Sequence, residues 1–293
     1  MVQLDQCPVC NSKEITNILT AKDYLVSGKE FNINSCSKCG LRFTNPRPND
    51  KELGSYYDSE EYISHANEST SLVNSLYKIA RSFTLGSKRR LVNNYAINKQ
   101  ILDVGCGTGH FLEQCKNHNW QVSGIEPNDL ARNQANQLLN GNVYQDISEI
   151  NNGEFEVITL WHVLEHLPDL NDTITQLKKR LQKKGTLIIA VPNYEAYEEK
   201  VFNEYWAAYD VPRHLYHFNQ NSLKHLFEKH GLKVVETLPM WLDSFYISLL
   251  SNKQQSGRNK YIKSFITGLL SNTYAIKSKD FSSLIYIIRN LED

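Results

Sequence analysis

The chain has 293 residues, of which 41% are hydrophobic, so it can form two compact units or one large domain with extensions. Its 32 basic and 32 acidic side chains cancel, and a net charge of zero argues against a broad nucleic-acid-binding surface. No apolar run approaches the roughly 20 residues of a membrane-spanning helix. The polar stretch Met1–Gln6 does not resemble a signal peptide, so we expect a cytoplasmic protein without a membrane span.

Four of the six cysteines are arranged as two Cys-x-x-Cys pairs, Cys7 with Cys10 and Cys36 with Cys39. Two such pairs can bring four thiolates to one ion, and four thiolates are a tetrahedral ligand set for structural zinc. Disulfides and a redox dithiol are the alternatives, but a reducing compartment disfavours disulfides, and two matched pairs fit a metal better than one reactive dithiol. A module this small lacks a sufficient core, so we expect the metal to supply its folding energy.

The 25 residues between the two pairs slightly exceed the usual spacer. A hairpin accounts for them, with Tyr24–Val26 as its first strand, a turn at 27–29 and Phe31–Ile33 as its second strand. The breaker cluster Asn45–Asn49 then ends the module. We therefore expect a small zinc-ribbon-like β module over residues 1–45.

The rest of the chain alternates between strand and helix patterns. Apolar segments predict seven strands, at 101–104, 121–125, 143–144, 155–160, 186–191, 232–238 and 281–289. Predicted helices lie at 128–139, at 170–181 with Gly185 ending the helix, and at 223–227. This alternation predicts a doubly wound, Rossmann-like α/β sheet. An apolar helical pattern over 240–280 predicts a long insertion, which we expect to form a wall of the substrate pocket.

The stretch Ile101–Leu112 runs from a buried strand into an amphipathic helix through Gly105, Gly107 and Gly109. Such a turn offers free N–H groups and the positive end of a helix dipole to a ligand, and a Cβ there would block close approach. It predicts a nucleotide-type cofactor site. The dinucleotide fingerprint G-x-G-x-x-G is not met, because a histidine occupies its third glycine position. Asp103, two residues before the first glycine, would repel a diphosphate but would suit a cationic ligand.

This acid-x-Gly-x-Gly-x-Gly stretch resembles the first motif of the class I S-adenosylmethionine-dependent methyltransferases, and the resemblance extends over about residues 99–239. It implies a seven-stranded sheet with an antiparallel last strand, and S-adenosyl-L-methionine as the cofactor. Glu126, at the carboxyl end of the second strand, would accept the ribose hydroxyls. Asp146 lies where the family places the acid that bonds the adenine amino group, although it could instead cap the next helix. The implied cofactor-binding residues are Asp103, Gly105, Cys106, Gly107, Gly109, Glu126, Pro127, Asp146, Ile147 and Trp161.

The family often builds a lid over the cofactor from the region before the first core strand, which is residues 46–98 here. Tyr56, Tyr57 and Tyr62 fit either such a lid or packing on the core, and the sequence leaves both open. Apolar residues recur at helical spacing between 72 and 83, and Lys88–Leu91 closes that helical segment. Its basic residues are interpreted as a solvated helix end rather than an anion site. The methyltransferase domain would then span residues 99–293, with insertions at 193–220 and 240–280.

Ligands of open α/β sheets lie outside the carboxyl ends of the strands, and Trp161–Pro168 follows the fourth strand. His162-x-x-Glu165-His166 matches a metalloprotease pattern, but that pattern needs one helix that carries both histidines, and this context does not offer it. In the family this position lies between methyl donor and acceptor, so His162 is a candidate general base. Some quinone-biosynthesis O-methyltransferases hold a metal with E-x-x-E-H at this position. Here His162 replaces the first acid, which argues against a metal, and the nearby proline favours a structural turn.

A second segment, residues 206–218, follows the fifth strand and is similar to an Asp-x-Pro-Arg-His-Leu-x-His-Phe stretch of many small-molecule methyltransferases. His214 and His217 are therefore rival candidates for the base. His217 could equally be a buried histidine bonded to backbone, and Asp210 could form a structural ion pair with Arg213.

The resemblance implies methyl transfer from S-adenosylmethionine to a small-molecule acceptor, which could be a sugar, a lipid or a natural-product intermediate. We expect O-methylation by in-line attack, with a histidine as general base. An RNA methyltransferase is an alternative, because zinc knuckles also precede such domains in enzymes that act on ribosomal RNA, but the zero net charge disfavours it. A non-catalytic cofactor-binding module and a nicotinamide oxidoreductase are further alternatives.

Overall fold

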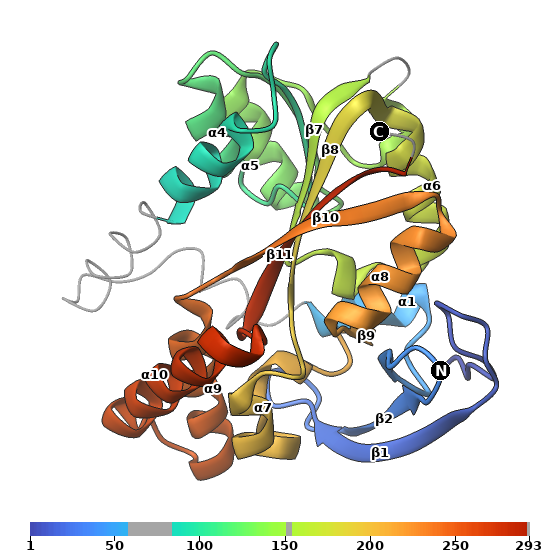
Figure 1. The fold of residues 1–293 in the computed structure, drawn as a ribbon, viewed down its shortest axis with the longest axis vertical. Coiled ribbons are helices and arrows are strands. Elements are labelled where there is room, and N and C mark those ends of the chain that lie inside the picture. The colour runs from blue at the N-terminus through green and yellow to red at the C-terminus, as the bar shows by residue number, and fades with distance from the viewer. Residues whose placement is uncertain (58–83, 151–153, 292–293) are drawn as a thin grey trace.

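The computed structural model describes residues 1–57, 84–150 and 154–291, and two sheets organise this part of the chain (Figure 1). The central sheet has the strand order β10-β11-β8-β7-β4-β5-β6. Its strands are β4 (Gln100–Val104), β5 (Gln121–Ile125), β6 (Val143–Tyr144), β7 (Phe155–Trp161), β8 (Leu181–Pro192), β10 (Leu232–Pro239) and β11 (Ser283–Asn290). β11 is antiparallel to both of its neighbours, whereas β4 to β8 pair in parallel. The predicted doubly wound sheet with an antiparallel last strand is confirmed.

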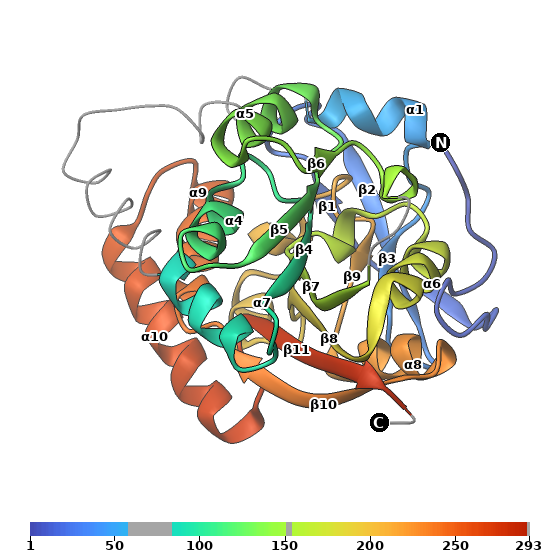
Figure 2. The ribbon, with the colours of Figure 1, turned by 90° about the horizontal axis from the view of Figure 1, so that it is seen from above.

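Helices cover both faces of the central sheet. In Figure 2, α4 and α5 lie on one side of the strands, and α6 and α8 lie on the other side. Their bounds are α4 (His110–Lys116), α5 (Asp129–Leu139), α6 (Leu170–Arg180) and α8 (Gln220–Lys229). Asn128, Asp169 and Asn219 cap α5, α6 and α8, because each side chain accepts a backbone N–H of the first turn. In contrast, α4 follows Gly109 directly and has no side-chain cap.

The smaller sheet has the antiparallel order β1-β2-β3-β9. Its strands are β1 (Ile15–Lys22), β2 (Glu30–Cys36), β3 (Arg42–Thr44) and β9 (Tyr216–His217). Three of these strands come from the N-terminal segment, but β9 follows the central strand β8 and pairs with β3 through Phe43 and Tyr216. No sequence pattern indicated this pairing, because two residues are too few to show a strand period.

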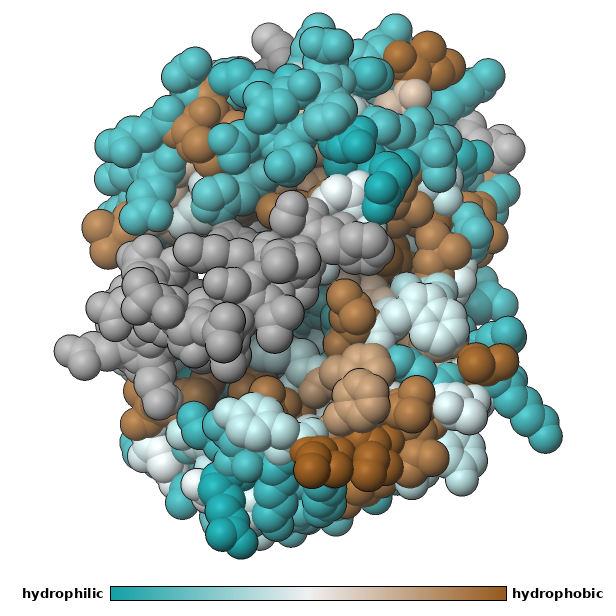
Figure 3. Space-filling model, turned by 90° about the vertical axis from the view of Figure 1, so that its left-hand side faces the viewer, coloured by the Kyte–Doolittle hydropathy of each residue, from teal (hydrophilic) through white to brown (hydrophobic). Residues whose placement is uncertain are grey.

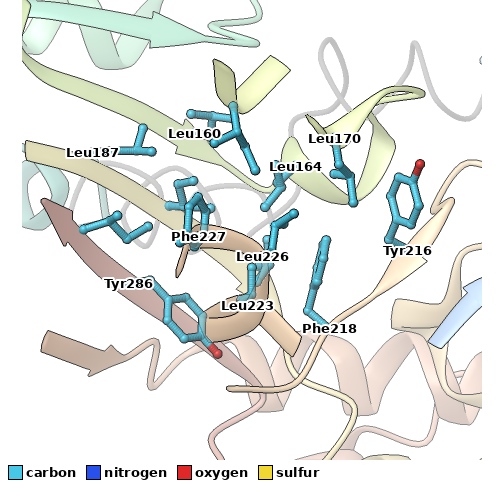
Figure 4. Packing of buried hydrophobic residues seen from close by; sticks show 14 of the residues in the cluster. Leu160, Leu164, Leu170, Leu187, Tyr216, Phe218, Leu223, Leu226, Phe227 and Tyr286 are labelled. Carbon is cyan, nitrogen blue, oxygen red and sulfur yellow. The ribbon is translucent and has the colours of Figure 1, made fainter. Parts of the chain in front are cut away.

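A single buried apolar cluster joins the two sheets. It contains side chains labelled in Figure 4, from β7, β8, η3 (Leu164–His166), β9 and α8: Leu160, Leu187, Leu164, Tyr216, Leu223, Leu226 and Phe227. The same cluster includes Cys36 and Phe43 of the N-terminal strands. The apolar core is therefore continuous from the central sheet into the small one. Cys7, Cys36 and Cys39 belong to this core, and Cys10 packs against it.

The segment between β10 and β11 is a helical hairpin of α9 (Asp243–Ser256) and α10 (Tyr261–Ser278), which lies beside α7 (Tyr197–Phe202) in Figure 1. Short helical turns complete the described structure: α1 (Asp50–Leu53), η1 (Gly54–Tyr56), η2 (Ile147–Glu149), η4 (Asn203–Tyr205) and η5 (Ala207–Tyr209). Residues 84–93 are helical, whereas the predicted helical spacing at 72–83 and Tyr62 lie outside the described residues. Among the described helices, none combines the length and the apolar character that a bilayer crossing requires.

Two predicted element positions are wrong. The first hairpin strand is β1, and the predicted strand Tyr24–Val26 forms the turn instead. The reason is Asp23, whose carboxylate accepts the backbone N–H groups of Leu25, Val26 and Ser27 and so fixes a turn. Gly185 does not end a helix, because α6 stops at Arg180 and β8 is already running at Leu181. A Cβ on Gly185 would lie 2.8 Å from Leu181 Cδ1, so this glycine permits close packing within the strand.

Arg213 ties the N-terminal module to the rest of the protein. Its guanidinium is 1% exposed, and Nη2 lies 3.0 Å from Asp23 Oδ1 and 2.7 Å from Asp210 Oδ1. Nη1 also donates to the carbonyl oxygen of Tyr56 at 3.2 Å. Asp210 and Arg213 thus form the structural ion pair that was the alternative interpretation of this segment. Removing one partner would leave a buried carboxylate unpaired.

We predict that Arg213→Met lowers the free energy of unfolding by about 3–5 kcal/mol, the range for breaking a buried ion pair. Arg258→Met is the matched control, since Arg258 is exposed, and it is expected to change stability by less than about 0.5 kcal/mol. Urea unfolding followed by fluorescence measures both variants. A loss below about 1 kcal/mol for Arg213→Met would show that this ion pair does not hold the two parts together.

Candidate cofactor and acceptor site

The glycine turn lies at the carboxyl end of β4. Gly105, Gly107 and Gly109 have φ angles of 69°, 56° and 82°, a region that favours glycine. A Cβ on Gly105 would lie 2.5 Å from Val163 Cγ2, and one on Gly109 would lie 3.0 Å from Ala135 Cβ. These two glycines are therefore required by packing as well as by the backbone. Around Gly107 a Cβ would meet nothing within 4 Å, so the middle of the turn borders open space.

Glu126 faces this turn from the end of β5. Its Oε2 accepts the N–H of Gly107 at 2.9 Å, and its Oε1 accepts the N–H of Asn128 at 2.9 Å. Arg132 Nη1 donates to the carbonyl oxygens of Glu126 and Pro127, both at 2.9 Å. The carboxylate is therefore held across the turn from Gly107. Ribose hydroxyls are donors that such a fixed carboxylate can accept.

Asp103 is the last acid of β4 before the turn, and it is 3% exposed. Burial raises the pKa of Asp103 to about 7, although the hydrogen bond from Thr159 and the charge of Lys88 lower it. Thr159 Oγ1 donates to Asp103 Oδ1 at 2.6 Å. At neutral pH this carboxyl is therefore divided between its two protonation states. A cationic ligand would favour the charged form.

Lys88 is a residue that the sequence interpretation missed. Its Nζ lies 4.4 Å from the centroid of the Trp161 ring. The sequence interpretation had instead placed this side chain in solvent at the end of a helix. Burial lowers the pKa of Lys88, whereas the charges of Asp103 and Asp243 raise it. No local signal separates Lys88 from the next two basic residues, because only the packing of helix 84–93 decides which one turns inward. An ammonium over an aromatic ring marks a place that accepts positive charge.

The remaining predicted cofactor-binding residues include Cys106, Asp146 and Trp161, which lie at or after the carboxyl ends of β4, β6 and β7. Trp161 meets Phe111 edge to face at 5.6 Å. Cys106 is buried, and its Sγ would lie 2.7 Å from a Cβ on Gly124, so its role here is to pack against β5. Asp146 caps η2 by accepting the N–H of Ser148 at 2.8 Å, while its side chain stays exposed and Ile147 packs against the core. The capping alternative for Asp146 is thus observed.

His162 follows β7 in a left-handed conformation, with φ of 58°. Its Nε2 lies 3.2 Å from Asp243 Oδ2, and its Nδ1 lies 3.5 Å from Glu165 Oε1. Burial lowers the pKa of His162, but the hydrogen bonds and charges of Asp243 and Glu165 outweigh burial and raise it to about 9. The side chain is still 33% exposed. His162 is therefore an accessible imidazole with two acidic partners.

Asp243 was not recognised from the sequence, although one signal was present. It is the only acid between Glu236 and Asp280. The insertion that contains it begins α9 with this residue and places its carboxylate against His162. The expectation that residues 240–280 form a wall of the substrate pocket stays a prediction.

Glu165, His166 and His214 form a second polar group beside His162. Their potential ligand atoms lie within 4.8 Å of one another, so their spacing could hold a metal ion. His166 Nδ1 donates to Arg213 O at 3.1 Å, and His214 Nδ1 donates to Ala208 O at 2.8 Å. Among the described residues, Glu165 Oε2 has no hydrogen-bond partner, and Oε1 has only the 3.5 Å contact with His162 Nδ1. Burial and the neighbouring charge of His214 lower the pKa of His166 to about 4, so His166 itself is neutral at pH 7.

His217 is 4% exposed and lies between Thr44 and the ring of Tyr209. Its Nε2 is 3.4 Å from Thr44 Oγ1, and burial lowers its pKa. This environment is that of a packed histidine.

The four N-terminal cysteines converge. Cys7 Sγ lies 3.5 Å from Cys39 Sγ, Cys10 Sγ lies 3.5 Å from Cys36 Sγ, and all four atoms lie within 4.8 Å of one another. These separations exceed the ~2.05 Å of a disulfide. They are close to the ~3.8 Å that tetrahedral zinc with ~2.3 Å bonds would impose. Asn11 and Gly40, with φ of 58° and 79°, turn the chain after each pair. The donor set fits zinc.

The sheet order and the glycine turn with its facing acid define the fold of the class I S-adenosylmethionine-dependent methyltransferases. A family model described as a methyltransferase domain matches residues 80–237, which is more than half of the chain, and the chain belongs to that family.

Curated relatives include the ubiquinone biosynthesis O-methyltransferases of Coxiella burnetii and Actinobacillus pleuropneumoniae. The first is 34% identical over a 121-residue alignment, and the match covers 36% of this chain and 52% of that protein. The second is 32% identical over a 113-residue alignment, and the match covers 34% of this chain and 48% of that protein. The chain thus spans about half the length of these relatives.

Two solved structures show the same fold at low identity. The magnesium protoporphyrin IX methyltransferase from Synechocystis PCC 6803, with bound SAH, has a TM-score of 0.54 and 13% identity, and the match covers 83% of this chain and all of that one. The plantazolicin methyltransferase BamL, in complex with a triazolic desmethylPZN analogue and SAH, has a TM-score of 0.51 and 13% identity, and the match covers 80% of this chain and 92% of that one.

We predict that the imidazole of His162 titrates near pH 9, and that Asp243→Asn lowers its pKa toward the ordinary 6.5. The reason is that Asp243 supplies both a hydrogen bond and a negative charge to the protonated ring. Asp280→Asn, which removes an acid that does not contact His162, is the control and should leave the titration unchanged. Nitrogen-detected NMR of the histidine rings measures this. An unshifted pKa in Asp243→Asn would refute the contact.

Proposed function

We propose that this protein transfers the methyl group of S-adenosylmethionine to an oxygen of a small-molecule acceptor. The observation that carries the proposal is the open turn at Gly107 with the carboxylate of Glu126 fixed across it. The two curated relatives named above are O-methyltransferases, which supports oxygen as the attacked atom. Their names do not identify the acceptor of this chain.

The charges around the turn favour a sulfonium nucleoside over a dinucleotide. Asp103 and Glu126 both border the place where a diphosphate would have to lie, and two carboxylates repel a diphosphate. In contrast, the cofactor we propose carries a sulfonium and an ammonium. The Lys88 ammonium lies over the Trp161 ring in this structure. We expect this ammonium to move away from the ring when the cofactor binds. Asp103 would then lose its proton to the solvent.

His162 is the base we propose among the three candidate histidines. His217 is fully packed, and His214 is 9% exposed with Nδ1 bonded to Ala208 O, whereas His162 is one-third exposed. Asp243 and Glu165 hold its ring from two sides, and they stabilise the imidazolium that forms when the acceptor loses its proton. Because the donor methyl is already activated, the protein otherwise contributes orientation and exclusion of water.

This assignment is tested with radiolabelled S-adenosylmethionine and pools of phenols, sugars, lipids and RNA. We expect label in one small-molecule pool, and at least a hundredfold lower turnover for His162→Gln, since general bases contribute about 10²–10⁴-fold. Activity should rise with pH up to about 9, because the base form of His162 becomes populated there. Label in RNA alone, or unchanged turnover in His162→Gln, would contradict the proposal.

We also predict that Glu126→Gln weakens binding of S-adenosylhomocysteine by about 10- to 100-fold. An amide cannot accept two ribose hydroxyls as a carboxylate does, and hydrogen bonds to charged groups contribute ~1.5–3 kcal/mol. Glu228→Gln, at an exposed position on α8, is the matched control. Isothermal titration calorimetry gives both affinities. Equal affinities in the two variants would show that Glu126 does not bind the ribose of the cofactor.

We propose that Cys7, Cys10, Cys36 and Cys39 hold one structural zinc ion. Four thiolates leave no open coordination position, so the ion would fix the N-terminal turns and take no part in methyl transfer. Since Cys36 and Cys39 belong to the apolar cluster that joins the two sheets, we propose that residues 1–45 act as a fixed part of the protein.

We predict about one zinc per purified chain, near-zero zinc in Cys36→Ser, and a lower unfolding temperature in that variant. Cys115→Ser is the control, because Cys115 is buried in α4 away from the four ligands and should not alter the zinc content. Elemental analysis and thermal unfolding measure these outcomes. Zinc retained in Cys36→Ser would exclude this site.

A further inference from the structure

The helix α10 buries its small and polar residues and exposes its large apolar residues, which is the reverse of an ordinary surface helix. Its small and polar residues face the protein, namely Ser264, Thr267, Gly268, Ser271, Asn272 and Ala275, which are all buried. Gly268 allows α9 to approach, since a Cβ there would lie 2.7 Å from Phe245 Cδ1. Asn252 of α9 donates to Ser264 Oγ at 2.9 Å. The hairpin therefore closes through small residues and leaves the large ones outside.

The outer face of α10 is an apolar stripe with helical spacing. It consists of Ile262, Phe265, Ile266, Leu269, Leu270 and Ile276, each at least 40% exposed and Ile262 79% exposed. Tyr261 and Tyr274 flank it, and both are also more than half exposed. Figure 3 shows brown side chains gathered over the lower half of this side of the molecule, where Figure 1 places α9 and α10. Among the described residues nothing covers this stripe, which is a larger apolar surface than scattered exposed residues make.

The charged residues that follow Asp243 in the hairpin are all basic. Residues 244–279 contain Lys253, Arg258, Lys260, Lys263, Lys277 and Lys279 but no acid, in a chain whose net charge is zero. Lys260 and Lys263 stand at the start of α10, and Lys277 and Lys279 stand at its end. A shallow groove at the start of the helix is lined by Lys260, Tyr261, Ile262, Lys263, Ile266 and Thr267. Apolar side chains thus lie between two basic ends.

A second copy of this chain does not fit this surface. In either orientation, α10 packed on α10 would bring the lysines of one helix against those of the other, with no acid in residues 244–279 to pair them. A nucleic acid would match the charge but would offer nothing to the six apolar side chains. An anionic lipid bilayer matches both features, because acyl chains accept the apolar stripe and headgroups accept the lysines.

We propose that the outer face of α10 docks in the plane of an anionic membrane surface. The helix lies on the surface and does not cross it, in keeping with its basic ends. Asp243, the first residue of α9, contacts His162, so the same hairpin would bring the acceptor side of the site toward the lipid. The inference concerns binding and does not depend on the proposed methyl transfer.

The test is flotation of the purified full-length chain with vesicles of phosphatidylcholine alone or with about 30% phosphatidylglycerol. We expect at least tenfold stronger binding to the anionic vesicles, weakened by added salt. Ile262→Glu should reduce binding at least tenfold, because it places a carboxylate in the apolar stripe. Leu130→Glu is the matched control, since it adds the same charge at a 68% exposed leucine on α5. It should bind like the unmodified protein.

Both positions are exposed, so we expect both variants to fold, and circular dichroism and thermal unfolding would check this. Three outcomes would overturn the proposal: no binding to anionic vesicles, equal binding of Ile262→Glu and Leu130→Glu, or a dimer that Ile262→Glu dissociates without any vesicle binding. The last outcome, measured by light scattering, would assign the stripe to self-association.

Discussion

The hydrogen bond from the N–H of Gly107 to Glu126 joins the ends of β4 and β5, and the site is arranged around it. A left-handed turn of three glycines brings the backbone to this point, and Val163 and Ala135 pack against the outer two so closely that no side chain fits there. Only the middle glycine borders open space. A carboxylate fixed opposite a bare backbone is suited to a ligand with vicinal hydroxyls, and the buried Asp103 behind it is suited to a cation. The proposed cofactor follows from these two acids together.

The opposite side of the site depends on parts that are distant in sequence. His162 follows β7, Asp243 begins the hairpin between β10 and β11, and both meet in one ion pair. The same hairpin carries the apolar stripe and its lysines. If the stripe binds a membrane, the α9–α10 hairpin has two roles. Its residue Asp243 orients His162, and its outer face on α10 holds the protein at the membrane. In the N-terminal direction, Arg213 and β9 tie the cysteine module to the same framework.

The sequence alone predicted those features that follow from a local hydrophobic period or from a fixed spacing of residues. The central strands, the glycine turn and the two cysteine pairs belong to this group, because each depends on residues within a few positions of one another. Features made by tertiary packing were missed. The strand β9 is only two residues long, Lys88 differs from its basic neighbours only by the face of its helix, and Asp243 reaches His162 from 81 positions away. The misplaced hairpin strand has a different cause, since Asp23 turns the chain by accepting three backbone N–H groups where apolar residues suggested a strand.

A crystal structure of the protein with S-adenosylhomocysteine tests the central assignment most directly. We predict that the nucleoside lies above Gly107, that both ribose hydroxyls bind the carboxylate of Glu126, and that Lys88 is displaced from Trp161. A nucleoside bound elsewhere, or a dinucleotide diphosphate seated over the glycine turn, would contradict it.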